Sequence, residues 1–238
     1  MYALAERLYP ICRSITGNGV RETLAILNEF IPLSIVEVPS GTKVLDWEIP
    51  DEWNIRDAWI KNSSGEKIVD FKKLNLHVVN YSVPVDKTLE LKELKEHLHT
   101  IPDSPYWIPY RTSYYNPQWG FCMPHHQFIN LEEGEYQVKI DSEVKPGSLT
   151  YGELLIPGNT KEEVLFSCHI CHPSLCNDNL SGIVLAAELA GILNKLDLHY
   201  SYRFLFIPAT IGSIAWLSKN DEILQNIKQG MILSLLGE

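Results

Sequence analysis

The feature that most constrains the fold is an alternation of apolar segments in the C-terminal half of the chain. "EEVLFSCH" (162–169) and "SYRFLFIPA" (201–209) have the length and apolar content of buried strands, and "SGIVLAAELAGILNKL" (181–196) has the periodicity of a helix. We expect a further helical segment at 212–229 and a third strand at 230–238. Strand, helix, strand, helix and strand in this order predict a parallel sheet with right-handed crossovers.

The preceding part of the chain contains two kinds of sequence pattern. Residues 1–30 have helical spacing interrupted by "SITGNG", and strands are predicted at "LSIVEVPSG" and "TYGELLIPG". Between them, residues 44–146 are rich in Trp, Pro and short alternating runs, which predict a mostly β module. We therefore expect one α/β domain built from 1–43 and 147–238, with 44–146 inserted into it.

Individual elements of the insertion are predicted from local patterns. Short strands are expected at "AWIKN", "LHVVNYSVPV", "WGFCM" and "YQVKID", where apolar and polar residues alternate. The run "TLELKELKEHLHT" (88–100) is interpreted as an exposed helix, with Thr88 as its N-cap.

Composition excludes several classes of partner. The 238 residues carry a formal net charge of −10 without a basic patch, which argues against nucleic acid and against anionic membranes. The apolar runs are too short to span a bilayer, and the charged N-terminus, with Glu6 and Arg7, does not have the pattern of a signal peptide. The five Cys are odd in number and three are bunched, unlike a secreted disulfide framework. We therefore expect a cytoplasmic protein.

The segment "FSCHICHPSLCNDNLSG" (166–182) concentrates metal-binding residue types at the end of a predicted strand. In open α/β sheets, ligands bind beyond the carboxyl ends of the strands, where His169 and His172 are expected. Asp178 follows at the mouth of the next helix, and imidazole nitrogen with carboxylate oxygen is a zinc-type ligand set. A carboxylate can also bridge two zinc ions.

Three other interpretations of this segment remain open. Cys168, Cys171 and Cys176 could hold zinc together with a histidine, although their spacing is cramped. Cys168 and Cys171 also have the C-x-x-C spacing of a thiol redox site. Finally, the segment could be a polar loop whose histidines are buried and hydrogen-bonded, because two histidines alone often have no other role.

The segment "H…NDNLSGIVLAAELA" resembles the first metal-binding motif of co-catalytic zinc aminopeptidases. Further phrases, "LYPICRSITGNGVRETL", "VPSGTKVLDWEIPDEWNIRDAWI", "IPYRTSYYNPQWGFC", "GSLTYGELLIPG" and "CHPSLCNDNLSG", resemble a bacterial family of aminopeptidase-like proteins often encoded near polysaccharide-biosynthesis genes. The resemblance implies a zinc-exopeptidase fold, with a mixed sheet sandwiched by helices and a β-rich insertion. It also implies one or two zinc ions, with His169 as a ligand and Asp178 bridging, and a peptide or amide-containing substrate. His172 is an additional candidate.

The sequence departs from this family at two places. The family has a glutamate as general base after the next strand, in a "PETIGS" context, whereas this chain has Ala209 in "IPATIGS". Glu238, the final residue, stands where a zinc-binding carboxylate is expected, and the last histidine ligand and later strands of the fold would lie beyond it. We therefore expect impaired hydrolysis, in a fragment, a truncated gene product, or a chain whose exposed sheet edge a partner or second copy covers.

The insertion offers a second set of candidates. "PYRTSYYNPQWG" contains Arg111, Tyr115 and Trp119, which could bind a peptide or sugar, although an aromatic core is the plainer interpretation. His125 and His126 could bind metal, but no acidic residue accompanies them in the sequence. The alternative function is therefore a non-catalytic glycan- or peptide-binding module on an aminopeptidase scaffold.

Overall fold

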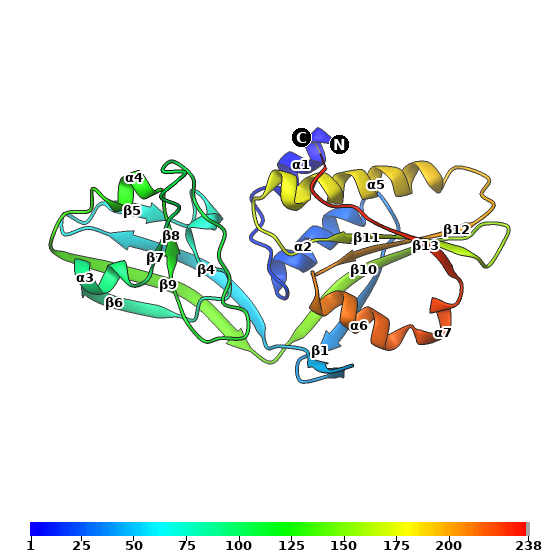
Figure 1. Ribbon diagram of the computed structural model, residues 1–238, viewed down its shortest axis with the longest axis horizontal. Coiled ribbons are helices and arrows are strands. Elements are labelled where there is room, and N and C mark those ends of the chain that lie inside the picture. Colours follow the sequence, from blue (N-terminus) through cyan, green and yellow to red (C-terminus); the bar gives the residue numbers. More distant parts are fainter. Residues whose placement is uncertain (237–238) are drawn as a thin grey trace. The chain divides into compact units, whose positions relative to one another are not determined.

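The computed structural model describes residues 1–236, which form two compact units (Figure 1). Unit 1 comprises Met1–Glu52 and Pro146–Glu238, and unit 2 comprises Trp53–Lys145. Because the second unit interrupts the first in sequence, unit 1 is assembled from segments far apart in the chain. Within residues 1–236, no helix combines the length and the apolar content needed to cross a membrane.

A five-stranded mixed sheet is the centre of unit 1, with strand order β1-β10-β12-β11-β13. β11 pairs in parallel with β12 and with β13, as the alternation of strands and helices predicts. β10 is antiparallel to both β1 and β12, which makes the sheet mixed. The strands are β1 (Ser34–Pro39), β10 (Ser148–Ile156), β11 (Glu163–His169), β12 (Ser201–Ile207) and β13 (Ile227–Ile232).

Helices lie on both faces of this sheet (Figure 1). α1 (Tyr2–Leu8), α2 (Asn18–Leu27) and α5 (Ser181–Leu193) pack on one face through a core that includes Leu24, Phe166 and Phe204. α6 (Ile211–Lys219) and α7 (Asp221–Leu224) lie on the other side. The fold predicted for this part of the chain, a mixed sheet between helices, is confirmed.

Unit 2 contains a four-stranded sheet of order β5-β4-β9-β6 with its own apolar core. Aliphatic side chains such as Ile60, Val69 and Val138 are fully enclosed. The elements are β4 (Glu52–Lys61), β5 (Lys67–Asp70), η1 (Asn75–His77), β6 (Val85–Glu90), α3 (Leu91–Lys95), β7 (Leu98–His99), β8 (Phe121–Cys122), α4 (His125–Phe128) and β9 (Glu135–Lys145). A short hairpin of β2 (Lys43–Val44) and β3 (Trp47–Glu48) belongs to unit 1.

Three local predictions are wrong. Thr88 is not a helix N-cap, because it lies inside β6 opposite Gln137 of β9, and the helix is limited to Leu91–Lys95. The expected strand at 76–85 is a 3-10 turn followed by an irregular segment with isolated bridges. Residues 227–229, predicted as the end of a helix, begin β13, since pairing with β11 outweighs the helical pattern.

Candidate metal centre

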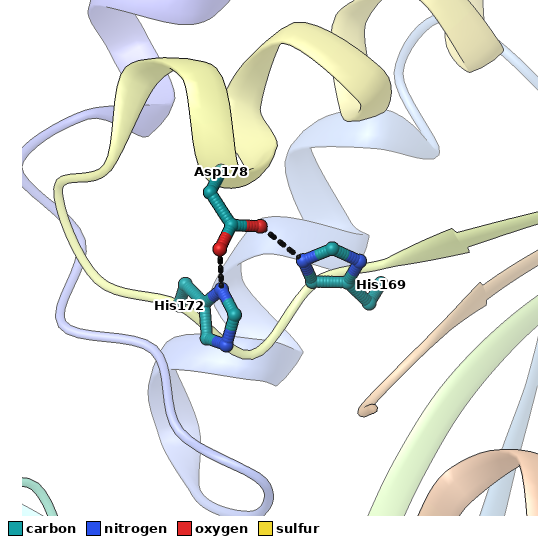
Figure 2. Close-up of side chains that lie close together, drawn as sticks. All are labelled: His169, His172 and Asp178. Carbon is teal, nitrogen blue, oxygen red and sulfur yellow. Dashed lines mark hydrogen bonds and ion pairs between the residues drawn. The ribbon is translucent and has the colours of Figure 1, made fainter. Parts of the chain in front are cut away.

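The site forms where β11 ends and the chain turns toward α5 (Figure 2). His169 is the last residue of β11, His172 follows in a loop, and Asp178 lies in the irregular turn η2 (Cys176–Leu180) before α5. Asp178 and Asn179 have non-helical backbone angles, and the peptide bond between them is cis. The carboxyl end of a parallel strand therefore carries the site, as expected for an open α/β sheet.

Asp178 contacts both histidines through different oxygens. His169 Nε2 lies 2.7 Å from Asp178 Oδ1, and His172 Nδ1 lies 3.3 Å from Asp178 Oδ2 (Figure 2). One donor atom from each of the three side chains lies within 4.8 Å of the others. The two imidazole rings are 4.8 Å apart and nearly perpendicular, at 71°. A carboxylate that faces two imidazoles in this way has the form of a bridging ligand.

The donor set fits a zinc ion chemically. Two imidazoles and one carboxylate are ligands that zinc prefers, and the histidine side chains are only 16% and 18% exposed. Burial lowers the pKa of His172 below its ordinary value of 6.5, which favours the neutral ring with a free lone pair. Since metal binding requires a deprotonated imidazole, this burial favours binding near neutral pH.

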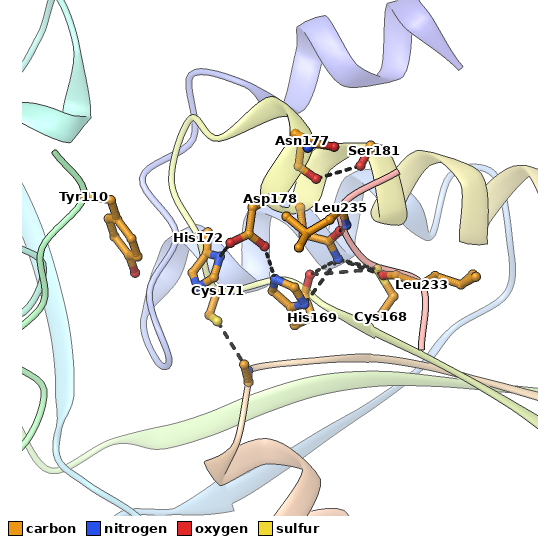
Figure 3. Close-up of polar contacts among 12 residues, drawn as sticks. Tyr110, Cys168, His169, Cys171, His172, Asn177, Asp178, Ser181, Leu233 and Leu235 are labelled. Atoms are coloured by element: carbon orange, nitrogen blue, oxygen red, sulfur yellow. Dashed lines mark hydrogen bonds and ion pairs between the residues drawn. The ribbon is translucent and has the colours of Figure 1, made fainter. Parts of the chain in front are cut away.

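Asn179, which the sequence analysis did not single out, connects the site to the segment after β13. Its side chain is buried, and Nδ2 donates to the His169 carbonyl at 3.1 Å and to the Leu233 carbonyl at 3.0 Å. Its Oδ1 accepts from the Leu235 amide at 3.3 Å. Figure 3 shows Leu233 and Leu235 beside His169 and Cys168. The run of polar residues in "CNDN" is the sequence signal that could have indicated a role for Asn179 at the site.

Cys168 and Cys171 each contact a different neighbouring group. Cys168 and Cys171 are buried, and burial raises the pKa of each thiol, that of Cys171 to about 11. Cys168 Sγ accepts from Asn179 Nδ2 at 3.3 Å, and Cys171 Sγ accepts from the Ala209 amide at 3.3 Å. Cys176 is exposed. The high pKa values disfavour the thiolate that a cysteine zinc site or redox site needs.

The structure does not gather all the predicted residues. Ala209 follows β12 and approaches the site through its main chain, and its methyl group offers no acceptor. Glu238 lies outside the described residues. In unit 2, Arg111 and Tyr115 are exposed, whereas Trp119 is partly buried against the core and stacks on His97 at 3.6 Å.

The comparisons with known proteins agree with the fold. Residues 2–238 match a family model described as "Domain of unknown function (DUF4910)". A "Putative polysaccharide biosynthesis protein with aminopeptidase-like domain" from Clostridium acetobutylicum is 56% identical over all 238 residues of this chain. This chain spans 55% of the length of that relative.

Two solved structures share the fold of this chain. A "putative peptidase" from Clostridium acetobutylicum is 56% identical, with a TM-score of 0.98 over 100% of this chain and 56% of the other. A zinc aminopeptidase from Bacillus subtilis is 12% identical, with a TM-score of 0.63 over 99% of this chain and 68% of the other. The resemblance to an aminopeptidase-like family is thus confirmed, and the second structure shows a shared fold.

Proposed function

The chain belongs to the DUF4910 family, and from this premise we propose that it is a zinc-binding, aminopeptidase-like unit for hydrolysis of peptide or amide bonds. The observation that carries the proposal is the Asp178 carboxylate, which directs one oxygen to His169 and the other to His172. The aminopeptidase-like scaffold supports it. The Asp178 carboxylate and the imidazoles of His169 and His172 would hold one or two zinc ions.

Zinc in such a site acts as a Lewis acid toward the carbonyl to be hydrolysed. The chain's own contribution is to place His169 and His172 beside one carboxylate, and burial of His172 favours the neutral form of that ring. Proton transfer is the weak point, because the methyl group of Ala209 cannot accept a proton. We therefore propose that hydrolysis by this chain is slow and that metal binding is intact.

Metal content tests the ligand set. The purified chain is expected to retain zinc, as measured by elemental analysis after dialysis against dilute zinc and then against buffer. His169→Ala and Asp178→Ala should lose it. His199→Ala and Asp197→Ala, which change an exposed histidine and an exposed aspartate of the same unit, should retain it. Wild-type protein without zinc would contradict the proposal.

Restoring a carboxylate tests the missing base. Ala209→Glu should raise the rate of zinc-dependent hydrolysis of aminoacyl p-nitroanilides by about 10²–10⁴-fold, the usual contribution of general base catalysis. Ala209→Gln is the matched control, because it has the same size but cannot act as a base. Equal rates in the two variants would show that position 209 does not supply proton transfer.

A second candidate function is non-catalytic binding of a glycan or peptide by unit 2. Tyr106 and Trp107 are 76% and 69% exposed in the loop that follows β7. The Tyr106 ring contacts His126, which lines an open groove of about 590 Å³ together with Gln127 and Asn130. Exposed aromatic rings beside amide groups suit a hydroxyl-rich ligand. Quenching of tryptophan fluorescence by neutral oligosaccharides, lost in Trp107→Ala, would favour this function.

We also propose a cytoplasmic location. The five cysteines are free thiols, which is the state favoured by a reducing compartment. Labelling of thiols in intact and lysed cells tests this directly.

A further inference from the structure

We propose that Arg13 is a positioning residue for the metal centre. Its guanidinium holds the main chain of His172 in place and thereby fixes the ring that faces Asp178. The inference rests on the proposed metal binding, and it assigns a role to an N-terminal segment distant in sequence from the ligands.

Arg13 is completely buried and donates to two main-chain carbonyls. Nε donates to the His172 carbonyl at 3.0 Å, and Nη1 donates to the Leu8 carbonyl at 2.7 Å. The guanidinium is planar, so its donors have a fixed mutual geometry. Two carbonyls bound to one such group are therefore held at a fixed separation, which ties the end of α1 to the loop that carries His172.

A second hydrogen bond joins the same two segments. Ser174 Oγ donates to the Tyr9 carbonyl at 2.7 Å, and Ser174 is buried. The loop after β11 is thus held at residues 172 and 174 by the segment Tyr9–Arg13, which we call the N-terminal brace. Regular secondary structure cannot supply this support, because residues 170–175 lie in neither a helix nor a strand.

α2 packs closely against the N-terminal brace at Gly19. A Cβ at Gly19 would lie 2.1 Å from the Cys12 carbonyl oxygen and 3.1 Å from the Arg13 Cα. Only glycine allows this approach, so the helix and the brace are in direct main-chain contact. The N-terminal brace is therefore held in place by α2, and it in turn holds the loop after β11.

The importance for binding follows from how metal ligands are held. His169 is fixed by β11, whereas the orientation of His172 depends on a loop without regular structure. Groups that hydrogen-bond to the metal ligands, without touching the ion, hold those ligands in the orientation that binding requires. Loss of such a group typically weakens metal affinity by about 10–100-fold. Arg13 and Ser174 are such groups, acting through the main chain of the loop.

The test compares zinc affinity in Arg13→Lys, Ser174→Ala and the wild-type chain by competition with a chromophoric chelator. Lysine keeps the charge but offers its donors from one nitrogen on a flexible stem, so it lacks the planar fork that holds the Leu8 and His172 carbonyls at a fixed separation. We expect affinity to fall by about 10-fold in Arg13→Lys and less in Ser174→Ala. The visible spectrum of the Co²⁺-substituted chain should broaden or shift in both.

Arg203→Lys is the matched control. Arg203 is also a buried arginine of unit 1, but it donates to Glu163 and Glu153 within the sheet. This variant should lower the melting temperature equally with and without zinc and leave zinc affinity unchanged. In Arg13→Lys, the rise in melting temperature on adding zinc should itself shrink, which a purely structural role would not produce.

Three outcomes overturn the inference and can be told apart. If the wild-type chain binds no zinc, the proposed function fails and the inference fails with it. If the wild-type chain binds zinc and Arg13→Lys binds it equally well with the same Co²⁺ spectrum, only the inference fails. Should Arg13→Lys not fold, unchanged affinity and spectrum in Ser174→Ala would decide against it.

Discussion

Each unit of the molecule contains a closely spaced pair of histidines. One pair contacts a carboxylate, whereas the other contacts neutral groups. His169 and His172 in unit 1 both face the Asp178 carboxylate. In unit 2, His125 Nδ1 lies 3.0 Å from Thr100 Oγ1, and His126 Nδ1 lies 3.0 Å from the Pro105 carbonyl. In the second pair, the Nδ1 atom of each ring contacts a neutral group of the same unit.

The difference shows that closeness in sequence does not make a metal site. The second pair is adjacent in the chain, yet within residues 1–236 it belongs to no cluster of three converging histidine, cysteine or acidic side chains. The first pair becomes a candidate because η2 returns a carboxylate to the end of β11. An anionic ligand in the right place therefore distinguishes the two regions more than the histidines do.

The largest effect is expected from removing that anionic ligand. Asp178→Asn keeps the size of the side chain but removes its charge, so zinc affinity should fall by at least about 100-fold, the upper end of what loss of an outer-shell partner costs. The double variant His125→Ala/His126→Ala should bind zinc as the wild-type chain does. Isothermal titration with Zn²⁺ measures both. If only the double variant lost zinc, the metal site would lie at His125 and His126 and not at Asp178.

An intermediate effect is expected at the start of α5, the helix that follows the Asp178 turn. A Cβ at Gly182 would lie 2.4 Å from the Leu233 carbonyl oxygen and 2.5 Å from Asn179 Oδ1. Gly182→Ala should therefore lower the free energy of unfolding by about 1–3 kcal/mol, the usual cost of overpacking.

Gly191 in the same helix provides the matched control. A Cβ there would meet nothing within 4 Å, so Gly191→Ala should be neutral or stabilise by up to about 1 kcal/mol. Urea unfolding followed by circular dichroism measures both variants. Equal stability of the two would mean that the turn before α5 can relax, and the site would be less rigid than its contacts indicate.

The smallest effect is expected at a histidine of unit 2 that contacts a main-chain carbonyl. His77 Nδ1 lies 2.8 Å from the Cys122 carbonyl, and burial lowers the pKa of His77 below its usual 6.5. As pH falls below about 6.5, the unfolded chain gains a proton that the folded chain does not, so stability decreases with falling pH. The urea midpoint, followed by tryptophan fluorescence, should fall between pH 7.5 and 5.5.

The variant His77→Gln separates this contribution from other titrating groups. Glutamine can still donate to the Cys122 carbonyl but does not titrate, so the decrease should be smaller than in the wild-type chain. A decrease of the same size in both proteins would assign it to other groups.

The fold of unit 1 was predictable because its strands and α5 are continuous apolar segments of ordinary length. The same reasoning failed at 88–100, where pairing of β6 with β9 outweighed the local helical pattern, and at 227–229. His169, His172 and Asp178 were predictable as candidates because they lie within one short segment. Arg13 was not, since its partner His172 is 159 residues away and a single arginine gives no periodic signal.

The amide of Asn179 also sets an order of events during synthesis of the chain. It binds the His169 carbonyl from the strand before it and the Leu233 carbonyl from a segment 54 residues later. A nascent chain that has left the ribosome only as far as β12 therefore has both histidines and Asp178 but leaves Asn179 without its Leu233 and Leu235 partners. The contacts of Asn179 in this turn are completed only after the segment that follows β13 is in place, so a growing chain contains the candidate metal ligands before it contains all the residues that hold the turn.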